Sequence, residues 1–219
     1  MNVLLMEWKK YMTMSTNKFL KTLSTSKIVV ILRNIKIDQI EEYVGLLESN
    51  GLNTIEITLN SPNPFKSIEL VSKKFPKINL GAGTVILKSD ISKLLDIGVK
   101  FIVSPNTDPQ IIEETLNKNL ISIPGFYTAT EGFKAIKYGA TILKLFPASS
   151  NGLNLIKDYS AVFPSHVKLI PTGGINFDNM VDFLDKSFAI GMGGVLFSEY
   201  ISLQNFKDRI KKIKTILKK

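Results

Sequence analysis

The chain has 219 residues, 44% of them hydrophobic, and a formal net charge of +9. This length fits one large domain or two small ones. The chain contains no cysteine and a single histidine, His166, which excludes a disulfide framework, a thiolate nucleophile or metal site, and a histidine cluster.

The start of the chain has a short apolar stretch before Glu7, Lys9 and Lys10. A signal peptide carries its positive charges first, and no apolar run is long enough for a membrane span. We therefore expect a cytoplasmic protein without a membrane partner. Alternative starts at Met12 and Met14 suggest an N-terminal extension over residues 1–18, without fixed structure, before a single domain over 19–219.

Short apolar runs rich in β-formers recur along the chain, and most are separated by helical patterns. The runs begin near residues 28, 54, 78, 100, 120, 141, 167 and 188. The helical patterns include 38–49, 89–97, 109–117, 129–137, 176–185 and a final one at 202–217. Residues suited to helix entry precede several of them, namely Ser89, Asp108, Thr128 and Asn176.

Eight such alternations without a linker predict an α/β protein with a (β/α)8 TIM-barrel fold. The alternative is an open doubly wound sheet. That fold favours a glycine-rich turn after the first strand, whereas this chain has Arg33-Asn34-Ile35 there.

The positive charge has two interpretations, a nucleic-acid surface or a solvated helix face. The lysines are scattered, and the densest group lies in segment 207–219, whose apolar residues recur at helical spacing. This pattern favours the helix face, so we expect no nucleic-acid partner. A mild positive field also suits an anionic substrate.

Lys144 lies within an apolar strand that a proline ends, in the run Ala140-Thr141-Ile142-Leu143-Lys144-Leu145-Phe146-Pro147. Burial disfavours a charged, unpaired amine, and a neutral amine is a nucleophile that forms Schiff bases with carbonyl compounds. The alternative for a lone lysine is a side chain that reaches water at the strand end.

Glu56 lies in a predicted strand over residues 54–60, among β-branched residues. An inward carboxylate is costly unless it is paired or catalytic, and alone it is more often half of a structural ion pair. Together, Glu56 and Lys144 supply a proton-transfer group and a nucleophile.

Two glycine pairs follow the last two predicted strands, Gly173-Gly174 and Gly193-Gly194. A single pair is most simply a tight turn. Two pairs at these strand ends favour a phosphate site, because barrels often bind phosphate with the loops after strands seven and eight.

Four segments resemble the 2-keto-3-deoxy-6-phosphogluconate/phosphogalactonate aldolase family: residues 56–62 (EITLNSP), 81–85 (GAGTV), 143–148 (LKLFPA) and 171–174 (PTGG). The resemblance extends from about Ile28 to Phe197. It implies a class I aldolase on a (β/α)8 barrel, commonly a homotrimer. Such an enzyme cleaves a phosphorylated keto-deoxy sugar acid to pyruvate and glyceraldehyde 3-phosphate, without a metal or another cofactor.

The resemblance also implies roles for particular residues. Lys144 would form the Schiff base, and Glu56 would act as acid and base through a bound water. The substrate's carboxylate end would be held by Arg33 and Thr84, its phosphate by Thr172, Gly173, Gly174, Gly193 and Gly194, and the pocket walls would be Pro105 and Phe146.

Asn60 is the main departure from the phosphogluconate branch, which often has an arginine in this position. The context Leu59-Asn60-Ser61-Pro62 resembles the phosphogalactonate branch instead, and Arg33 is the expected substitute for the arginine. In the predicted strand Asn60 lies two pleats beyond Glu56, so we expect both side chains on the same inward face. We therefore predict 2-dehydro-3-deoxy-6-phosphogalactonate as the substrate. The alternatives are the phosphogluconate epimer (the Entner-Doudoroff reaction), dual specificity, an isomerase or epimerase on the same fold, and a non-catalytic sugar-phosphate-binding barrel.

Overall fold

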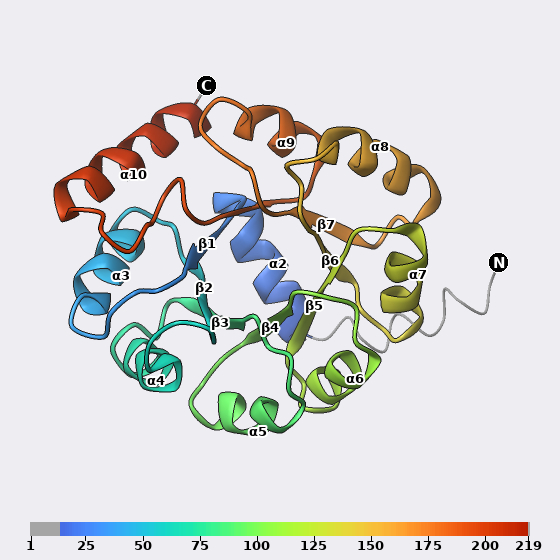
Figure 1. The fold of residues 1–219 in the computed structure, drawn as a ribbon, viewed down its shortest axis with the longest axis horizontal. Coiled ribbons are helices and arrows are strands. Elements are labelled where there is room, and N and C mark those ends of the chain that lie inside the picture. Colours follow the sequence, from blue (N-terminus) through green and yellow to red (C-terminus); the bar gives the residue numbers. More distant parts are fainter. Residues whose placement is uncertain (1–13, 219) are drawn as a thin grey trace.

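The computed structural model describes residues 14–218, and within them eight parallel strands form one sheet surrounded by helices (Figure 1). The strand order is β7-β6-β5-β4-β3-β2-β1-β8, and a parallel bridge between Thr172 and Gly191 joins β7 to β8. The strands are β1 (Ile28–Leu32), β2 (Thr54–Thr58), β3 (Asn79–Gly83), β4 (Phe101–Ser104), β5 (Ile121–Phe126), β6 (Ile142–Leu145), β7 (Lys168–Pro171) and β8 (Ile190–Met192).

The predicted (β/α)8 barrel is therefore confirmed, and the open-sheet alternative is wrong. In the barrel, β1 pairs with β2 on one side and with β8 on the other, so neither the first nor the last strand is a free edge. The helices are α2 (Met14–Ser26), α3 (Ile40–Ser49), α4 (Pro64–Lys74), α5 (Ser89–Asp96), α6 (Pro109–Asn117), α7 (Ala129–Lys137), α8 (Gly152–Val162), α9 (Met180–Lys186) and α10 (Leu203–Leu217).

Two of the four predicted helix caps are confirmed. The Asp108 carboxylate accepts from the N–H of Gln110, and Thr128 forms a capping box with Glu131. The other two predictions are wrong in position. Ser89 is the first residue of α5, after an N-cap at Lys88. Asn176 lies before α9 and accepts from the N–H groups of Asp178 and Asn179 in the preceding turn.

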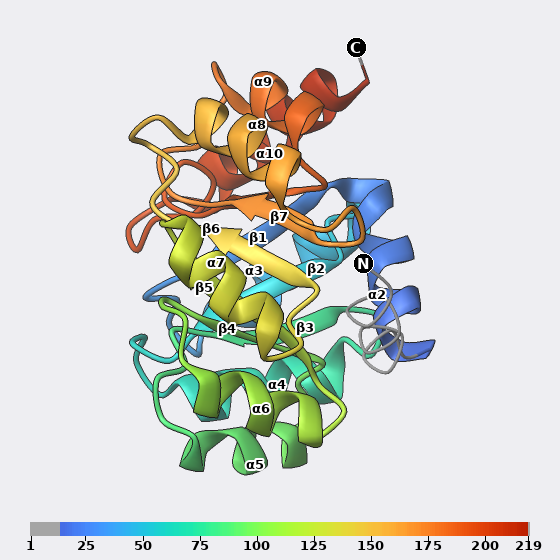
Figure 2. The same cartoon turned by 90° about the vertical axis from the view of Figure 1, so that its right-hand side faces the viewer.

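Helix α2 lies at the end of the barrel where the strands begin (Figure 2). Phe19 and Leu23 on this helix are buried in one apolar cluster with Val29 and Phe101, and the rings of Phe19 and Phe101 lie 5.2 Å apart. Residues 14–18, which the sequence assigned to an extension, therefore belong to a helix that closes the barrel. The rest of the expected extension, residues 1–13, lies outside the described part.

Side-chain alternation in the strands determines which residues face the barrel interior. In β6, Leu143 and Leu145 belong to the apolar layer between strands and helices, whereas Ile142 belongs to the interior cluster. Successive side chains of a strand point to opposite faces, so Lys144 shares the inward face with Ile142. In the part of the chain that the structure describes, no helix combines the length and apolar character needed to cross a membrane.

Candidate active site

Lys144 and Glu56 line the same small cavity inside the barrel. Their relative exposures are 6% and 2%, so both ionisable groups are shielded from bulk water. Lys144 comes from β6 and Glu56 from β2, which are separated by three strands in the sheet. The other lining residues are Val29, Val103, Ile123, Ile170, Thr172 and Gly191. The proton-transfer group and the amine predicted from the sequence are thus brought to one site.

The environment of Glu56 favours its protonated form more than water does. Burial raises the pKa of the Glu56 carboxyl, while the positive charges of Lys144 and then Arg33 partly oppose this shift. Among the described residues, the Oε1 atom of Glu56 has no hydrogen-bond partner. A buried oxygen of this kind costs free energy unless a ligand or water binds it. Glu56 is therefore suited to exchanging a proton with a bound molecule.

Gly83 on the neighbouring strand β3 provides the space that Glu56 occupies. A Cβ atom added at Gly83 would overlap the Glu56 carboxyl group, including Oε1. We therefore expect Gly83→Ala to displace the Glu56 side chain and to lower turnover about as much as removing the carboxylate, roughly 10²-fold.

A matched control is Gly45→Ala in α3, where a new Cβ would meet only Phe75, at 3.7 Å. Steady-state cleavage assays of both variants, with thermal melts, test this expectation. Wild-type turnover by Gly83→Ala would contradict the assigned packing.

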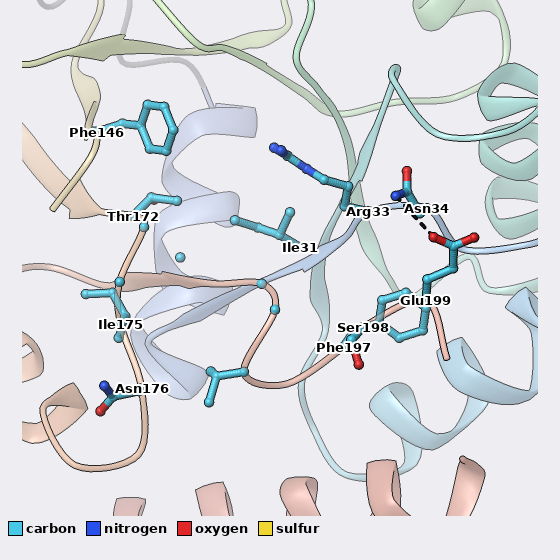
Figure 3. A pocket seen from close by; sticks show the side chains of 16 residues that line it. Ile31, Arg33, Asn34, Phe146, Thr172, Ile175, Asn176, Phe197, Ser198 and Glu199 are labelled. Carbon is cyan, nitrogen blue, oxygen red and sulfur yellow. Dashed lines mark hydrogen bonds between the residues drawn. The ribbon is translucent and has the colours of Figure 1, made fainter. Parts of the chain in front are cut away.

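A larger cavity of about 600 Å³ adjoins the small one, because Thr172 and Gly191 line both. Figure 3 shows Arg33 reaching across this space toward Phe146. Phe146 is 37% exposed, and its ring centroid lies 5.0 Å from Lys144 Nζ. The predicted residues Arg33, Phe146 and Thr172 are therefore brought together beside the buried pair, along with Gly173, Gly174, Gly193 and Gly194.

The two glycine pairs in the larger cavity differ in whether the backbone conformation calls for glycine. Gly173 and Gly174 have φ angles of +89° and +79°, a conformation that favours glycine whatever binds nearby. Gly193 and Gly194 have no such angle. A Cβ at Gly193 would meet only Ile31, at 3.7 Å, and one at Gly194 would meet no atom within 4 Å. Neither backbone conformation nor packing within the protein therefore requires glycine at 193 and 194. Glycine at both positions would instead let a ligand approach the backbone closely.

Three residues singled out from the sequence lie outside both cavities. Thr84 and Pro105 do not line either one; the Pro105 carbonyl instead packs where a Cβ at Gly125 would be. Asn60 is exposed and follows the end of β2 at Thr58. The expectation that Asn60 shares an inward strand face with Glu56 is therefore wrong, because the chain has already turned.

Several polar lining residues were missed by sequence reasoning. They belong to loops without a recognisable motif, namely Asn34, Asn176, Ser198 and Glu199. Asn34 Nδ2 donates to Glu199 Oε2 over 3.5 Å (dashed in Figure 3), and the Asn34 N–H donates to Ser61 Oγ at 2.9 Å. These bonds connect the loops after β1, β2 and β8 around one side of the cavity.

Three known aldolases are similar in sequence to this chain. A probable 2-dehydro-3-deoxy-6-phosphogalactonate aldolase from Rhizobium meliloti (strain 1021) is 36% identical over 83% of this chain and 87% of its own length. A 2-dehydro-3-deoxy-6-phosphogalactonate aldolase from Escherichia coli (strain K12) is 34% identical over 78% of this chain and 84% of its own length. A 2-dehydro-3-deoxy-phosphogluconate aldolase from Pseudomonas aeruginosa is 31% identical over 68% of this chain and 67% of its own length.

Solved structures show the same relationship. A native KDPGal structure superposes with a TM-score of 0.84 and 30% identity, over 87% of this chain and 94% of the other. A KDPG aldolase from Legionella pneumophila, with pyruvate captured as a covalent carbinolamine, superposes with a TM-score of 0.81 and 25% sequence identity. The match covers 90% of this chain and 97% of the other. The family model described as KDPG and KHG aldolase matches residues 20–215. The chain therefore belongs to the KDPG and KHG aldolase family, and it is an aldolase, a carbon–carbon lyase.

Proposed function

We propose that this aldolase works through a Schiff base on Lys144 and cleaves 2-dehydro-3-deoxy-6-phosphogalactonate to pyruvate and D-glyceraldehyde 3-phosphate. The observation that carries the proposal is the meeting of Lys144 and Glu56 in one buried cavity. The adjoining larger cavity has room for the rest of a six-carbon phosphosugar acid.

In the proposed mechanism, Lys144 Nζ adds to the C2 ketone and water leaves, giving a protonated imine. Glu56 takes the proton of the C4 hydroxyl, either directly or through a water. The C3–C4 bond breaks, C4 becomes the aldehyde of glyceraldehyde 3-phosphate, and the bonding electrons move to the imine nitrogen to form an enamine. Glu56 then protonates C3, and water hydrolyses the imine to release pyruvate and the free amine.

The raised pKa of Glu56 supports its double role. A general acid–base group works best when its pKa lies near the operating pH, since it must both accept and return a proton. Arg33 lines the larger cavity, and its positive charge influences Glu56, so we assign it to pair with the substrate carboxylate. No step requires a metal, because the imine serves as the electron sink.

The phosphate end is assigned to the larger cavity and its two glycine pairs. In the turn that begins at Gly193, the N–H groups of Leu196 and Phe197 donate to the Gly193 carbonyl at 2.8 and 2.9 Å. Within residues 14–218, no acceptor is found for the N–H groups of Gly194 and Val195. Free N–H groups at a cavity wall are the usual protein ligands of phosphate.

We expect kcat/KM for the phosphogalactonate epimer to equal or exceed that for the phosphogluconate epimer, by less than about tenfold. The support is that relatives at 36% and 34% identity are named for the first substrate and one at 31% for the second. The preference should be modest, because a site that merely avoids a clash with one hydroxyl discriminates weakly.

The measurement is a pyruvate-release assay with both epimers under identical conditions. A clearly higher kcat/KM for the phosphogluconate epimer would reverse the assignment while leaving the lyase mechanism intact. Cleavage of neither epimer would favour the non-catalytic sugar-phosphate-binding alternative. The homotrimer and the cytoplasmic location expected from the sequence stay predictions. A structural neighbour taken from a cage of fused symmetric oligomeric domains is consistent with an oligomer.

A further inference from the structure

Arg209 lies behind the glycine turn that follows β8. It is on α10, 15 residues after Gly194 and 13 after Leu196 in sequence. Its Nη1 atom donates to the carbonyl oxygens of Gly194 and Leu196, both over 3.4 Å. The guanidinium thus bridges two carbonyls of the turn that is proposed to face phosphate.

The bond to Gly194 determines the direction of the next N–H group. A trans peptide is planar, so its C=O and N–H point in opposite directions. With the Gly194 carbonyl directed at Arg209, the N–H of Val195 is directed to the other side of the turn. Val195 and Gly194 both line the larger cavity, and the Val195 N–H has no acceptor among the described residues.

Side-chain packing fixes the far end of the turn but not this peptide. Leu196 and Phe197 are buried, with 0% and 3% exposure, and the Phe197 ring packs edge-on against Tyr43. Gly194, by contrast, is exposed and has no atom within 4 Å of its Cβ position. Within residues 14–218, Arg209 supplies the side-chain hydrogen bond to the carbonyl of the Gly194–Val195 peptide, in addition to the turn bonds that close on the Gly193 carbonyl.

We propose that Arg209 is a positioning residue for the substrate's phosphate group. It holds the Gly194–Val195 peptide so that the Val195 N–H is presented to a phosphomonoester, and its fixed positive charge strengthens the anion site from behind. This inference rests on the proposed function, because it places the phosphate end of the substrate in the larger cavity.

The test compares Arg209→Gln and Arg209→Lys with Lys211→Gln, an exposed residue of the same helix whose substitution removes the same charge. We expect Arg209→Gln to raise KM for the phosphorylated substrate about fivefold, the scale of one hydrogen bond, with kcat within about twofold. Arg209→Lys should lie between Arg209→Gln and wild type, since an ammonium keeps the charge but lacks the planar fork. Lys211→Gln should match wild type.

Two further readouts separate positioning from a merely structural role. The dissociation constant of inorganic phosphate, measured at constant ionic strength, should rise in Arg209→Gln in parallel with KM. The dephosphorylated substrate should be used equally by both proteins. Unchanged KM and phosphate affinity, or equal losses with both substrates, would overturn the inference. Failure of the proposed function is distinguishable, because wild type itself would then release no pyruvate from either epimer.

Discussion

Replacing Lys144 by methionine should abolish aldol cleavage, with a loss on the order of 10⁴-fold or more, because no second lysine among the described residues lines either cavity to form the covalent intermediate. Methionine keeps an unbranched apolar chain in the buried position, so the fold should survive. Treating wild type with pyruvate and borohydride should attach one pyruvate-derived group to the peptide that contains Lys144. The variant should remain unlabelled.

The matched control is Lys168→Met. Lys168 is half-buried at the opposite, N-terminal end of a neighbouring strand, and it lies outside both cavities. This variant should label and turn over like wild type. Labelling of Lys144→Met, or label on a different lysine of the wild-type protein, would refute the assignment. Loss of activity without a change in the melting temperature would confirm that the effect is chemical.

The barrel and the placement of Lys144 and Glu56 in one cavity could be predicted because their signals are local. The strands are short, mostly apolar runs. The strand neighbours of Lys144 and Glu56 belong to the outer apolar layer, so alternation along β6 and β2 directs Lys144 and Glu56 inward. The fold then places both at one site. Helices α4 and α8 were not among the predicted helical patterns, although Pro64 at the start of α4 is a common first helical residue.

The residues that were missed depend on contacts between distant segments. Arg209 acquires its role only because α10 packs behind the turn after β8, and no sequence motif connects them. Gly83 is informative only once the position of the Glu56 carboxyl is known. Asn60 was assigned to the wrong surface because β2 ends two residues earlier than expected, and beyond a strand end the period of two no longer applies.

Glu56→Gln should slow cleavage about 10²-fold or more while leaving imine formation with pyruvate largely intact. Glutamine preserves the size of the side chain but cannot accept the C4 hydroxyl proton. The separation of the two steps is the informative result: borohydride trapping should still label Lys144, whereas release of glyceraldehyde 3-phosphate should nearly stop. If turnover stayed near the wild-type rate, the acid–base role would belong to another group.

The pH dependence provides an independent test of the same carboxyl. Since burial raises the pKa of Glu56, the acid limb of kcat/KM should lie at higher pH than for an ordinary carboxylate, and Glu56→Gln should lack it. The native state also binds this proton more tightly than the unfolded chain does. The free energy of unfolding should therefore fall as pH rises from the ordinary carboxyl range to the raised pKa, and Glu56→Gln should not show this fall.

Glu131 offers a control with the opposite sign. Hydrogen bonds from Thr128 and Tyr127 lower its pKa, so its contribution to stability is present above the ordinary carboxyl range and is lost as pH falls through the lowered pKa. Glu131→Gln should thus weaken the start of α7 while leaving the acid limb of kcat/KM in place. If the acid limb persisted in Glu56→Gln but disappeared in Glu131→Gln, the group that titrates in catalysis would not be Glu56.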